Sequence, residues 1–350
     1  MKQPDKPDAV PRLSAVRRRA LSAASGLVRF GGSFPLRIEP TAQGVDLASW
    51  ATGTHAMIEK KLAEHGALLF RHFDIEGIQA FERFVRAVAG GALEYRFRAS
   101  PRTEVGHHIY TATDYPADQS IFPHNEHAYS PVCPLRLFFY CQQPAAIGGE
   151  TPIGSGRAIT QAIDVGVCAR FKRKQVLYVR NYGDGFGLPW QTVFQTSDKA
   201  QVERYCKEVG IAIEWKSGDR LCTRQVGPAL VRHPRLGERI WFNHATFFHV
   251  TTLPSPVREA LLSEFDEADL PQNTYYGDGS AIETETLEYL RAVYRAAMVS
   301  FAWQPGDILL VDNILTVHGR RPFSGARRVL VAMADTFCPR DLAVQAEKLA

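Results

Sequence analysis

The chain contains 350 residues, 45% of them hydrophobic and 22% charged, and its formal net charge at pH 7 is +4. This composition is that of an ordinary globular protein with a sizeable core, so it excludes a disordered or fibrous chain. Because the basic residues are scattered among acidic ones, we expect no nucleic-acid partner, whereas the mild positive charge favours an acidic small molecule or an acidic carrier protein.

Residues 1–30 are rich in Pro, Lys and Arg, and we expect a flexible basic arm or one short helix there. Part of this arm faintly resembles a signal peptide, but it includes serines and a glycine and has no convincing cleavage site, so we expect no export. No stretch reaches the roughly 18–20 apolar residues that cross a bilayer. The six cysteines form no C-x-x-C pair, which favours a reduced, cytoplasmic protein over a zinc knuckle or a thioredoxin-like site.

Beyond the arm, the apolar spacing predicts a helix over 50–64, a buried strand over 66–71 and a second helix over 79–88. From about residue 95 onward, short apolar runs alternate with Gly and Pro turns, which is typical of a β-sandwich or barrel. Strands are predicted at 135–140, 175–179, 308–311, 315–317 and 328–333. Helices are predicted to interrupt them at 200–209, 256–265 and 284–298. We therefore expect one β-rich α+β domain over residues 31–340, followed by a tail at 341–350.

His124, Glu126 and His318 are the candidate metal ligands. A His-x-Glu pair puts an imidazole and a carboxylate on the same face of an extended strand, because side chains repeat every two residues. One distant histidine completes the two-His-one-carboxylate set that holds non-haem Fe(II) and leaves positions open for a cosubstrate and O₂. A lone His-x-Glu pair is weak evidence for a metal site. The simpler interpretation is that His124 is a loop histidine bonded to solvent. The Gly turn after His318, at a predicted strand end, favours the metal site.

Arg327 and Arg328 open the next predicted strand, a few residues after His318. A metal-bound 2-oxoacid needs a cation of this kind, because its far carboxylate must be neutralised and arginine does this through two parallel hydrogen bonds. One charge-assisted bond contributes about 1.5–3 kcal/mol. Strand alternation lets only one of these two neighbours point inward.

Several longer stretches make the chain recognisable. They are Ile-Phe-Pro-His-Asn-Glu-His at 121–127, Gly-Gly-Glu-Thr-Pro-Ile at 148–153, Trp-Gln-Pro-Gly-Asp at 303–307, and the segment 312–328. With them the chain resembles, from about residue 40 to 335, the Fe(II)/2-oxoglutarate-dependent dioxygenases of the taurine dioxygenase superfamily. It looks most like the clavaminate synthase-like branch, which includes the syringomycin-biosynthesis aspartyl hydroxylase. The resemblance implies a double-stranded β-helix (jelly-roll) core with flanking helices.

The resemblance also implies roles for particular positions. His124, Glu126 and His318 match the three iron ligands, and Thr151 matches the threonine that helps hold the cosubstrate carboxylate. Arg327 best matches the arginine that pairs with that carboxylate. Its spacing from His318 is a little shorter than in taurine dioxygenase, so Arg328 remains a competitor.

The implied cofactors are Fe(II), 2-oxoglutarate and O₂, with succinate and CO₂ as coproducts. A carboxylate at Glu126 implies hydroxylation rather than halogenation, while desaturation or cyclisation stays open. The implied substrate is an amino acid of specialised metabolism such as antibiotic biosynthesis, either free or tethered to an acyl or peptidyl carrier protein. Two other classes compete with this interpretation, namely a non-catalytic jelly-roll binding protein and a zinc hydrolase, because zinc also accepts two histidines and a glutamate.

Other polar residues have two interpretations each. Arg102 could reach a substrate carboxylate or be a solvated loop arginine. Asn243 could bind the substrate or cap a buried turn. His127 is expected to face the opposite side of the strand from His124, and Asp312 is expected to orient neighbouring backbone or a group behind the metal ligands.

Overall fold

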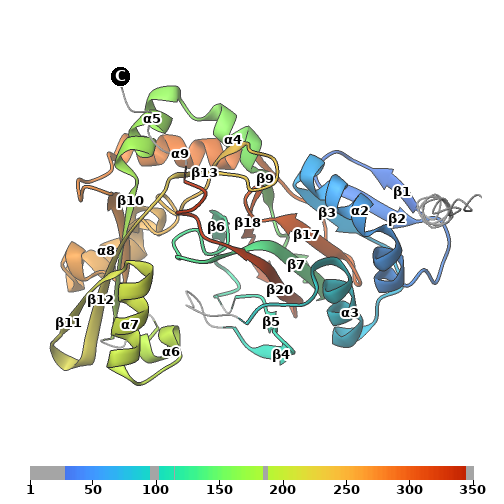
Figure 1. Ribbon diagram of the computed structural model, residues 1–350, viewed down its shortest axis with the longest axis horizontal. Coiled ribbons are helices and arrows are strands. Elements are labelled where there is room, and N and C mark those ends of the chain that lie inside the picture. Colours follow the sequence, from blue (N-terminus) through green and yellow to red (C-terminus); the bar gives the residue numbers. More distant parts are fainter. Residues whose placement is uncertain (1–27, 95–101, 114, 184–187, 344–350) are drawn as a thin grey trace, which may run out of the picture.

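The computed structural model describes residues 28–94, 102–113, 115–183 and 188–343 (Figure 1). At its centre, consecutive strands alternate between two sheets, which is the winding of a double-stranded β-helix. In chain order these strands are β6 (Ile121–His124), β7 (Cys133–Gln143), β9 (Ile153–Ser155), β17 (Ile308–Asp312), β18 (Thr316–Arg320) and β20 (Arg328–Phe337). The expected α+β jelly-roll is therefore confirmed.

The larger sheet has eight strands in the order β1-β2-β3-β17-β7-β20-β5-β4. Its outer strands are β1 (Val28–Gly31), β2 (Leu36–Pro40), β3 (Ala67–Phe70), β4 (Glu104–Gly106) and β5 (Ile109–Thr111). The central strands are apolar on both faces, so both faces must be covered. Phe138 and Leu310 pack on the face that carries the helices. Phe139 and Leu309, one residue along each strand, point into the jelly-roll.

Two helices, α2 (Leu47–His65) and α3 (Gly77–Ala89), cover the outer face of this sheet (Figure 1). The Asp46 carboxylate caps α2 by accepting a hydrogen bond from the Ser49 N–H at 2.7 Å. The helix ends at Gly66, whose φ of 75° favours glycine. A Cβ there would lie 3.0 Å from the Thr316 hydroxyl, so the end of α2 packs directly on the start of β18.

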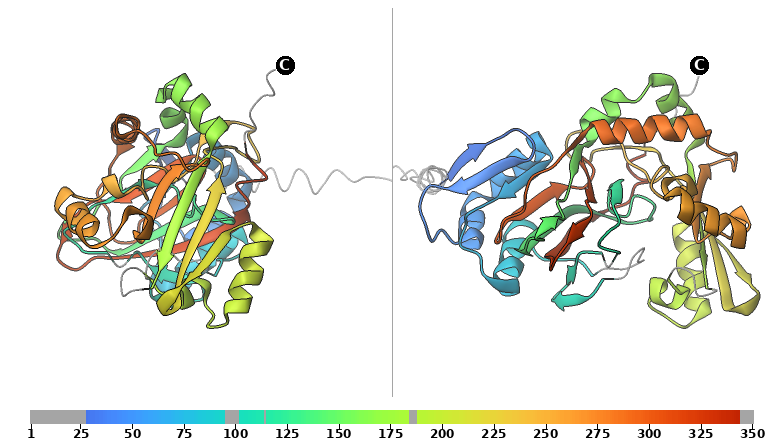
Figure 2. Two further views of the ribbon diagram at one scale, coloured as in Figure 1. Left: turned by 90° about the vertical axis from the view of Figure 1, so that its left-hand side faces the viewer. Right: turned by 180° about the vertical axis from the view of Figure 1, so that it is seen from behind.

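The smaller sheet has the order β16-β9-β18-β6, with β16 at Met298–Val299, and a two-stranded ribbon joins β8 (Ile147–Gly148) to β19 (Phe323–Ser324). Between β9 and β16 the chain inserts residues 156–297. The insertion holds a four-stranded sheet, whose strands in spatial order are β11 (Ala212–Lys216), β12 (Arg220–Gly227), β10 (Val176–Tyr182) and β15 (Gln272–Tyr276). It also holds a hairpin of β13 (Leu230–Arg232) and β14 (Arg239–Trp241). Figure 2 shows this sheet standing beside the jelly-roll.

The helices of the insertion are α4 (Gly156–Ala162), α5 (Val165–Lys174), α6 (Trp190–Phe194), α7 (Lys199–Val209), α8 (Ser255–Glu264) and α9 (Thr284–Ala296). Helices α7, α8 and α9 confirm three predicted helices, as α2 and α3 confirm the two before them. Helices α4, α5 and α6 were not predicted. Helices α4 and α6, with 7 and 5 residues, are too short to show a sustained helical period, whereas α5, with 10 residues, is as long as α8 and was missed.

The predicted arm needs one correction. Residues 28–30 do not belong to it, because Val28–Gly31 pairs with β2 as an antiparallel strand; residues 1–27 lie outside the described residues. At the other end, Ala343 forms a bridge with Val231, and 344–350 lie outside. Each of the six cysteines is a free thiol. Across the described ranges, no helix has the length and apolarity that a bilayer crossing requires.

Candidate metal centre

The two histidines are brought together by the pairing of β6 with β18. His124 and His318 are direct antiparallel partners, and their ring centroids lie 4.6 Å apart. Just past this pair the register shifts, so that Arg320 pairs with Ile121. A Cβ on Gly319 would lie 2.6 Å from the Ile121 carbonyl oxygen, so only glycine lets the strands approach this closely.

Glu126 reaches the histidines from a turn and not from a strand, which corrects the expected geometry. Strand β6 ends at His124, and Glu126 follows in the turn. Its Oε2 lies 3.9 Å from His124 Nε2 and 3.5 Å from His318 Nε2, and the ligand atoms of the three residues lie within 4.8 Å of one another. Ligand atoms about 2.1 Å from one ion stand roughly 3–4 Å apart. The donor set therefore fits a single ion with small side-chain rotations.

Asn313 holds the turn that carries Glu126. Its side-chain Oδ1 accepts from the Glu126 N–H at 2.7 Å, and its Nδ2 donates to the Glu126 carbonyl at 2.9 Å. In return, Asn125 donates from its Nδ2 to the Asn313 carbonyl at 2.6 Å. Both asparagines are fully buried. This pair of carboxamides replaces the strand pairing that Glu126 lacks, and so fixes the carboxylate relative to β18.

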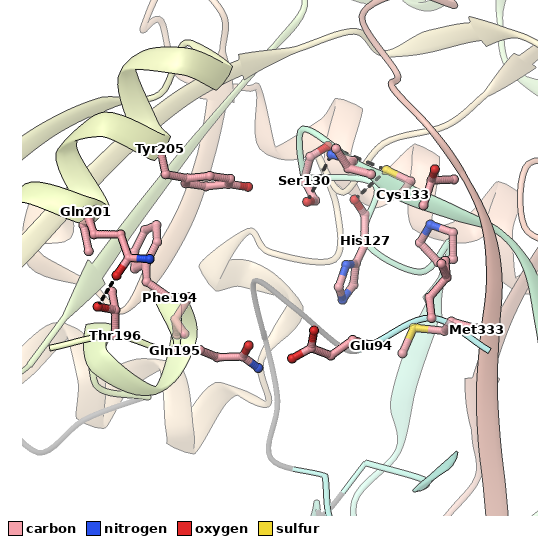
Figure 3. Close-up of a pocket in the computed structure, with 16 residues that line it drawn as sticks. Glu94, His127, Ser130, Cys133, Phe194, Gln195, Thr196, Gln201, Tyr205 and Met333 are labelled. Carbon is pink, nitrogen blue, oxygen red and sulfur yellow. Dashed lines mark hydrogen bonds between the residues drawn. The ribbon is translucent and has the colours of Figure 1, made fainter. Parts of the chain in front are cut away.

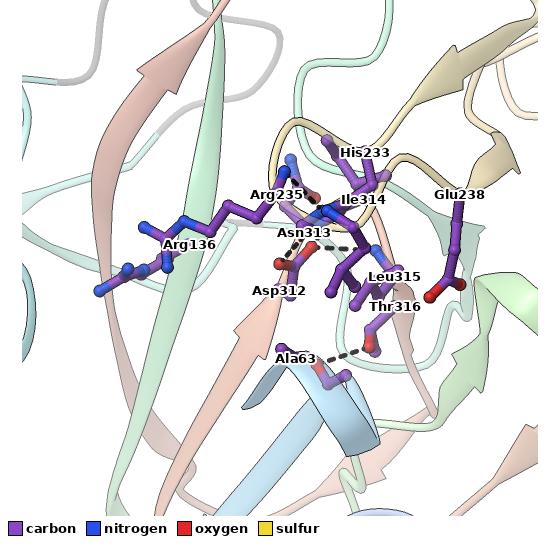
Figure 4. A network of polar contacts seen from close by, with 12 residues as sticks. Ala63, Arg136, His233, Arg235, Glu238, Asp312, Asn313, Ile314, Leu315 and Thr316 are labelled. Atoms are coloured by element: carbon purple, nitrogen blue, oxygen red, sulfur yellow. Dashed lines mark hydrogen bonds and ion pairs between the residues drawn. The ribbon is translucent and has the colours of Figure 1, made fainter. Parts of the chain in front are cut away.

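Asp312 orients the backbone that leads into β18, as expected (Figure 4). Its Oδ1 accepts from the N–H groups of Ile314 and Leu315 at 3.0 and 3.1 Å, and its Oδ2 lies 2.9 Å from His233 Nε2. The turn between β17 and β18 is thereby tied to the insertion. Asp312 acts on the metal centre by fixing the position of His318 and not by direct contact.

The protonation states of His124 and Glu126 suit metal binding. Burial lowers the pKa of His124 well below its ordinary value, and the neighbouring His318 lowers it further. Burial raises the pKa of the Glu126 carboxyl, but the Arg102 guanidinium and the nearby imidazoles outweigh this and hold that pKa well below its usual range. The His124 ring bonds the Phe122 carbonyl at 2.9 Å through Nδ1, which leaves the Nε2 lone pair facing Glu126. Neutral imidazole and ionised carboxylate are the forms that ligate metals.

Arg102 is the residue that contacts the Glu126 carboxylate most closely. Its Nη2 lies 3.1 Å from Oε1 and 3.2 Å from Oε2, and the side chains of both residues are buried. The solvated loop interpretation of Arg102 is therefore wrong. Arg102 also lines the pocket that holds the two histidines, so a single guanidinium borders both the ligand carboxylate and the open side of the site.

Thr151 lines the same pocket and is hydrogen-bonded by Trp303. The indole Nε1 of Trp303 donates to the Thr151 hydroxyl oxygen at 3.1 Å, and both side chains are buried. Because that oxygen already accepts one bond, the Thr151 O–H is directed to donate to another partner. Thr151 borders the pocket together with His124 and His318. Trp303 belongs to the Trp-Gln-Pro-Gly-Asp stretch, yet its bond to Thr151 could not be read from the sequence.

The structure separates the two neighbouring arginines. Arg327 lines the pocket with the histidines and donates from Nε to the Gly149 carbonyl at 2.9 Å, whereas Arg328 is exposed. Burial, helped by the nearby Arg320, lowers the pKa of Arg327 to about 10, so it stays charged at neutral pH. Gly149, with φ 75°, leaves room for this arginine, since a Cβ would lie 3.0 Å from Arg327 Cδ.

Arg320 is a third cation in the pocket, and sequence reasoning missed it. It follows His318 by two residues on β18 and lines the same pocket. Its guanidinium donates to the backbone carbonyls of Tyr115 and Gln119 at 3.0 and 2.9 Å. Two arginines beside a hydroxyl donor form a pocket suited to a dianion. The spacing His-x-Arg along one strand is the signal that could have identified it.

The structure also places Asn243 and His127. The Asn243 amide donates to the Ala229 carbonyl and accepts from the Ala245 N–H, both at 2.9 Å, so it caps a buried turn. His127 does not face away from the ligands. It lies in the turn with φ 59°, and its Nε2 is 3.6 Å from Glu126 Oε1. The strand alternation used to place it ends at His124.

Comparison with known proteins agrees with this geometry. The family model described as taurine catabolism dioxygenase TauD, TfdA family, matches residues 33–334. The chain is 42% identical over 286 residues to the dapdiamide synthesis protein DdaC of Enterobacter agglomerans, covering 82% of this chain and 87% of that protein. It is 30% identical over 286 residues to a clavaminate synthase-like protein of Arabidopsis thaliana, with coverages of 79% and 83%. Among solved structures, PvcB from Pseudomonas aeruginosa has the same fold, with a TM-score of 0.53 at 17% identity and coverages of 87% and 90%.

Proposed function

The chain belongs to the TauD/TfdA family and is an Fe(II)- and 2-oxoglutarate-dependent dioxygenase, and from that premise we propose that it hydroxylates an unactivated C–H bond of an amino-acid substrate. The observation that carries the proposal is the meeting of His124, Glu126 and His318 beside a pocket lined by Thr151 and Arg327. The chemistry that iron and 2-oxoglutarate supply when bound converts O₂, 2-oxoglutarate and a substrate R–H into succinate, CO₂ and R–OH.

The side chains divide the work of binding. His124, Glu126 and His318 would hold the ion on one face, and the opposite face stays open for the reactants. Arg327 would pair with the far carboxylate of 2-oxoglutarate, and the Thr151 hydroxyl would donate to the same carboxylate. The apolar neighbours Phe139, Val329 and Val331, which line the same pocket, keep water away and strengthen these charge-assisted bonds.

Arg102 is proposed to serve the substrate. In the structure its guanidinium neutralises the Glu126 carboxylate. When a divalent ion is bound to that carboxylate, the ion would neutralise it instead. The guanidinium is then able to bind a carboxylate of the substrate next to the metal. Replacing Arg102 with Leu should raise the KM for the amino-acid substrate while leaving the KM for 2-oxoglutarate unchanged. An equal rise in both constants would contradict this role.

The substrate class is supported by resemblance and by one relative. DdaC is named for dapdiamide synthesis, and the motifs resemble an aspartyl hydroxylase of specialised metabolism, whose substrate is an amino acid, free or bound to a carrier protein. Desaturation and cyclisation are the alternative outcomes of the same chemistry, because they depend on how the substrate lies. The six free thiols support a reducing, cytoplasmic setting.

The decisive experiment has two stages. Fe(II) and 2-oxoglutarate are first added anaerobically, and the weak visible charge-transfer band of their complex is expected; a binding protein or a zinc hydrolase stays colourless. Succinate release and product masses are then measured across free amino acids and carrier-bound aminoacyl thioesters. A product heavier by one oxygen supports hydroxylation, whereas a loss of two hydrogens identifies a desaturase or cyclase.

A further inference from the structure

A large cleft lies between the jelly-roll and the insertion, beyond the metal centre (Figure 3). Its volume is about 750 Å³. One wall carries His127, Ser130 and Met333 from the jelly-roll, and the other carries residues of α6, α7 and the loop between them. Pockets for drug-sized ligands span roughly 300–1,000 Å³, so this cleft holds a molecule considerably larger than a free amino acid.

The cleft and the metal pocket are neighbours along β20. Val329 and Val331 line the metal pocket, and Met333, on the same face of the strand, lines the cleft. Residues two apart on a strand are separated by about 7 Å. The cleft at Met333 therefore begins about this far from the end of the metal pocket at Val331. His127 joins the two from the other side, because it borders the cleft and lies 3.6 Å from Glu126 Oε1.

The lining mixes apolar side chains with polar ones and is almost uncharged. Among the described residues that border the cleft, Glu94 is the one carboxylate, His127 is the one imidazole, and none is a lysine or an arginine. The other polar groups are amides and hydroxyls, namely Ser130, Gln195, Thr196, Gln201, Tyr205 and Thr336. Such a surface recognises neutral hydrogen-bonding groups and offers no cation for a phosphate or a second carboxylate.

Glu94 and Gln195 point toward each other from opposite walls (Figure 3). A secondary amide is planar and trans, with its N–H and C=O directed to opposite sides. An amide lying between these walls can donate to the Glu94 carboxylate and accept from the Gln195 side-chain amide. Gln195 and His127 both have positive φ, 55° and 59°, which is uncommon for residues other than glycine and tends to occur at binding sites.

We propose that this cleft binds a neutral, secondary-amide-bearing extension of the substrate while the carbon to be oxidised sits at the metal. The inference rests on the proposed function and deepens it, because it makes the substrate an amide-linked molecule and not a free amino acid. A peptide and a pantetheinyl arm share this chemistry.

The test measures binding and not turnover. Calorimetry under anaerobic conditions, on the protein with Fe(II) and 2-oxoglutarate, uses two probes, S-methylpantetheine and N-acetylglycylglycine methylamide. Each is compared with the analogue in which ester oxygens replace the amide N–H groups. At least one amide probe is expected to bind about tenfold more tightly than its ester, as the loss of one or two hydrogen bonds predicts. The probe that binds identifies the source of the amide chain.

Two tryptophan substitutions locate the binding site. Val132→Trp is expected to fill the cleft, and because Val132 is 47% exposed this position tolerates a larger side chain. Val165→Trp is the control, because Val165 lies on α5 outside the cleft and is 82% exposed. The first is expected to weaken probe binding about tenfold or more, and the second to change it less than about twofold. Gln195→Asn, which shortens the side chain at a residue type that accepts positive φ, should also weaken binding.

Three results would overturn the inference: neither amide probe binds, every amide probe that binds does so no more tightly than its ester, or the two tryptophan variants behave alike. The charge-transfer band is recorded on the same samples. Its absence counts against the proposed function, whereas its presence together with a failure of probe binding counts against the cleft alone.

Discussion

The carboxamide of Asn313 hydrogen-bonds both backbone groups of Glu126, at 2.7 and 2.9 Å, across 187 residues of sequence. Asn313 lies five residues before His318, so one short segment carries one metal ligand and holds the backbone of another. The geometry of the candidate metal centre therefore depends on an asparagine that touches no reactant.

Replacing Asn313 with Ala should weaken metal binding. Three backbone groups lose a partner, namely the N–H and C=O of Glu126 and the C=O of Pro134, at a cost of about 1–3 kcal/mol each. Loosening the support of a ligand typically lowers metal affinity about 10- to 100-fold. Competition with a chromophoric chelator measures this. Asn181→Ala is the matched control, because Asn181 also donates to two backbone carbonyls, those of Ala268 and Leu270, but in the insertion. Equal loss of metal affinity in both variants would contradict the role of Asn313.

Glu126→Ala should abolish substrate-linked hydroxylation, because two neutral histidines alone hold Fe(II) weakly. The anaerobic charge-transfer band with 2-oxoglutarate should be lost or shifted in this variant. Glu104→Ala removes an exposed carboxylate of β4 and should leave both the band and the turnover intact. Full turnover by Glu126→Ala would remove the carboxylate from the ligand set.

Arg327→Leu should raise the KM for 2-oxoglutarate sharply. Removing the charge-assisted pair costs about 1.5–3 kcal/mol, which corresponds to roughly 10- to 100-fold. Arg328→Leu is the natural control, since this neighbour is exposed and should shift the constant by less than about twofold. If Arg328→Leu gives the larger effect, the choice between the two arginines is wrong.

Trp303→Phe and Thr151→Val should both weaken 2-oxoglutarate binding, and they should do so non-additively. The indole donates to the Thr151 hydroxyl, so removing the indole N–H frees that hydroxyl to rotate away from the cosubstrate. We expect each single change to cost about 0.5–1.5 kcal/mol, and the double variant to cost less than the sum. Titration of the charge-transfer band gives the binding constants. Strict additivity would show that Trp303 does not act through Thr151.

Protonation of His249 should contribute to a fall in the free energy of unfolding at acidic pH. His249 lies just before the short 3₁₀ turn Val250–Thr252. Burial, with Arg291 nearby, lowers the pKa of His249 to about 4, and its Nδ1 accepts from the Thr251 N–H at 3.2 Å. The folded state thus holds this imidazole neutral, whereas the unfolded chain protonates it near pH 6.5. The corresponding stability is complete above pH 6.5 and is lost as the pH falls towards 4, by about 3 kcal/mol.

Urea unfolding at pH 7 and at pH 4.5 tests this linkage. His249→Asn keeps an acceptor for the Thr251 N–H but does not titrate, so it should lose less stability between the two pH values than the unmodified protein. His72→Asn changes an exposed histidine and should follow the unmodified protein. Parallel pH dependence in all three would contradict the prediction for His249.

The sequence determined the element types and the residues of the centre. The spacing of apolar residues indicates which face of an element is buried, and it is a local property of the sequence. This spacing predicted helices α2 and α3, and apolar runs predicted strands β7, β17 and β20. The residue types at 124, 126 and 318 likewise indicated the chemistry, because two histidines and a carboxylate are the donors typical of non-haem Fe(II) sites.

Tertiary structure alone decided how those donors are held. Glu126 lies in a turn set by Asn313, Thr151 is oriented by Trp303, and Arg102 is drawn to Glu126, and each of these bonds joins segments whose separation no local pattern encodes. The cleft beyond Met333 exists only because the insertion packs beside the jelly-roll. Periodicity reports which side of an element is buried, whereas hydrogen bonds between distant segments depend on where the whole chain places them.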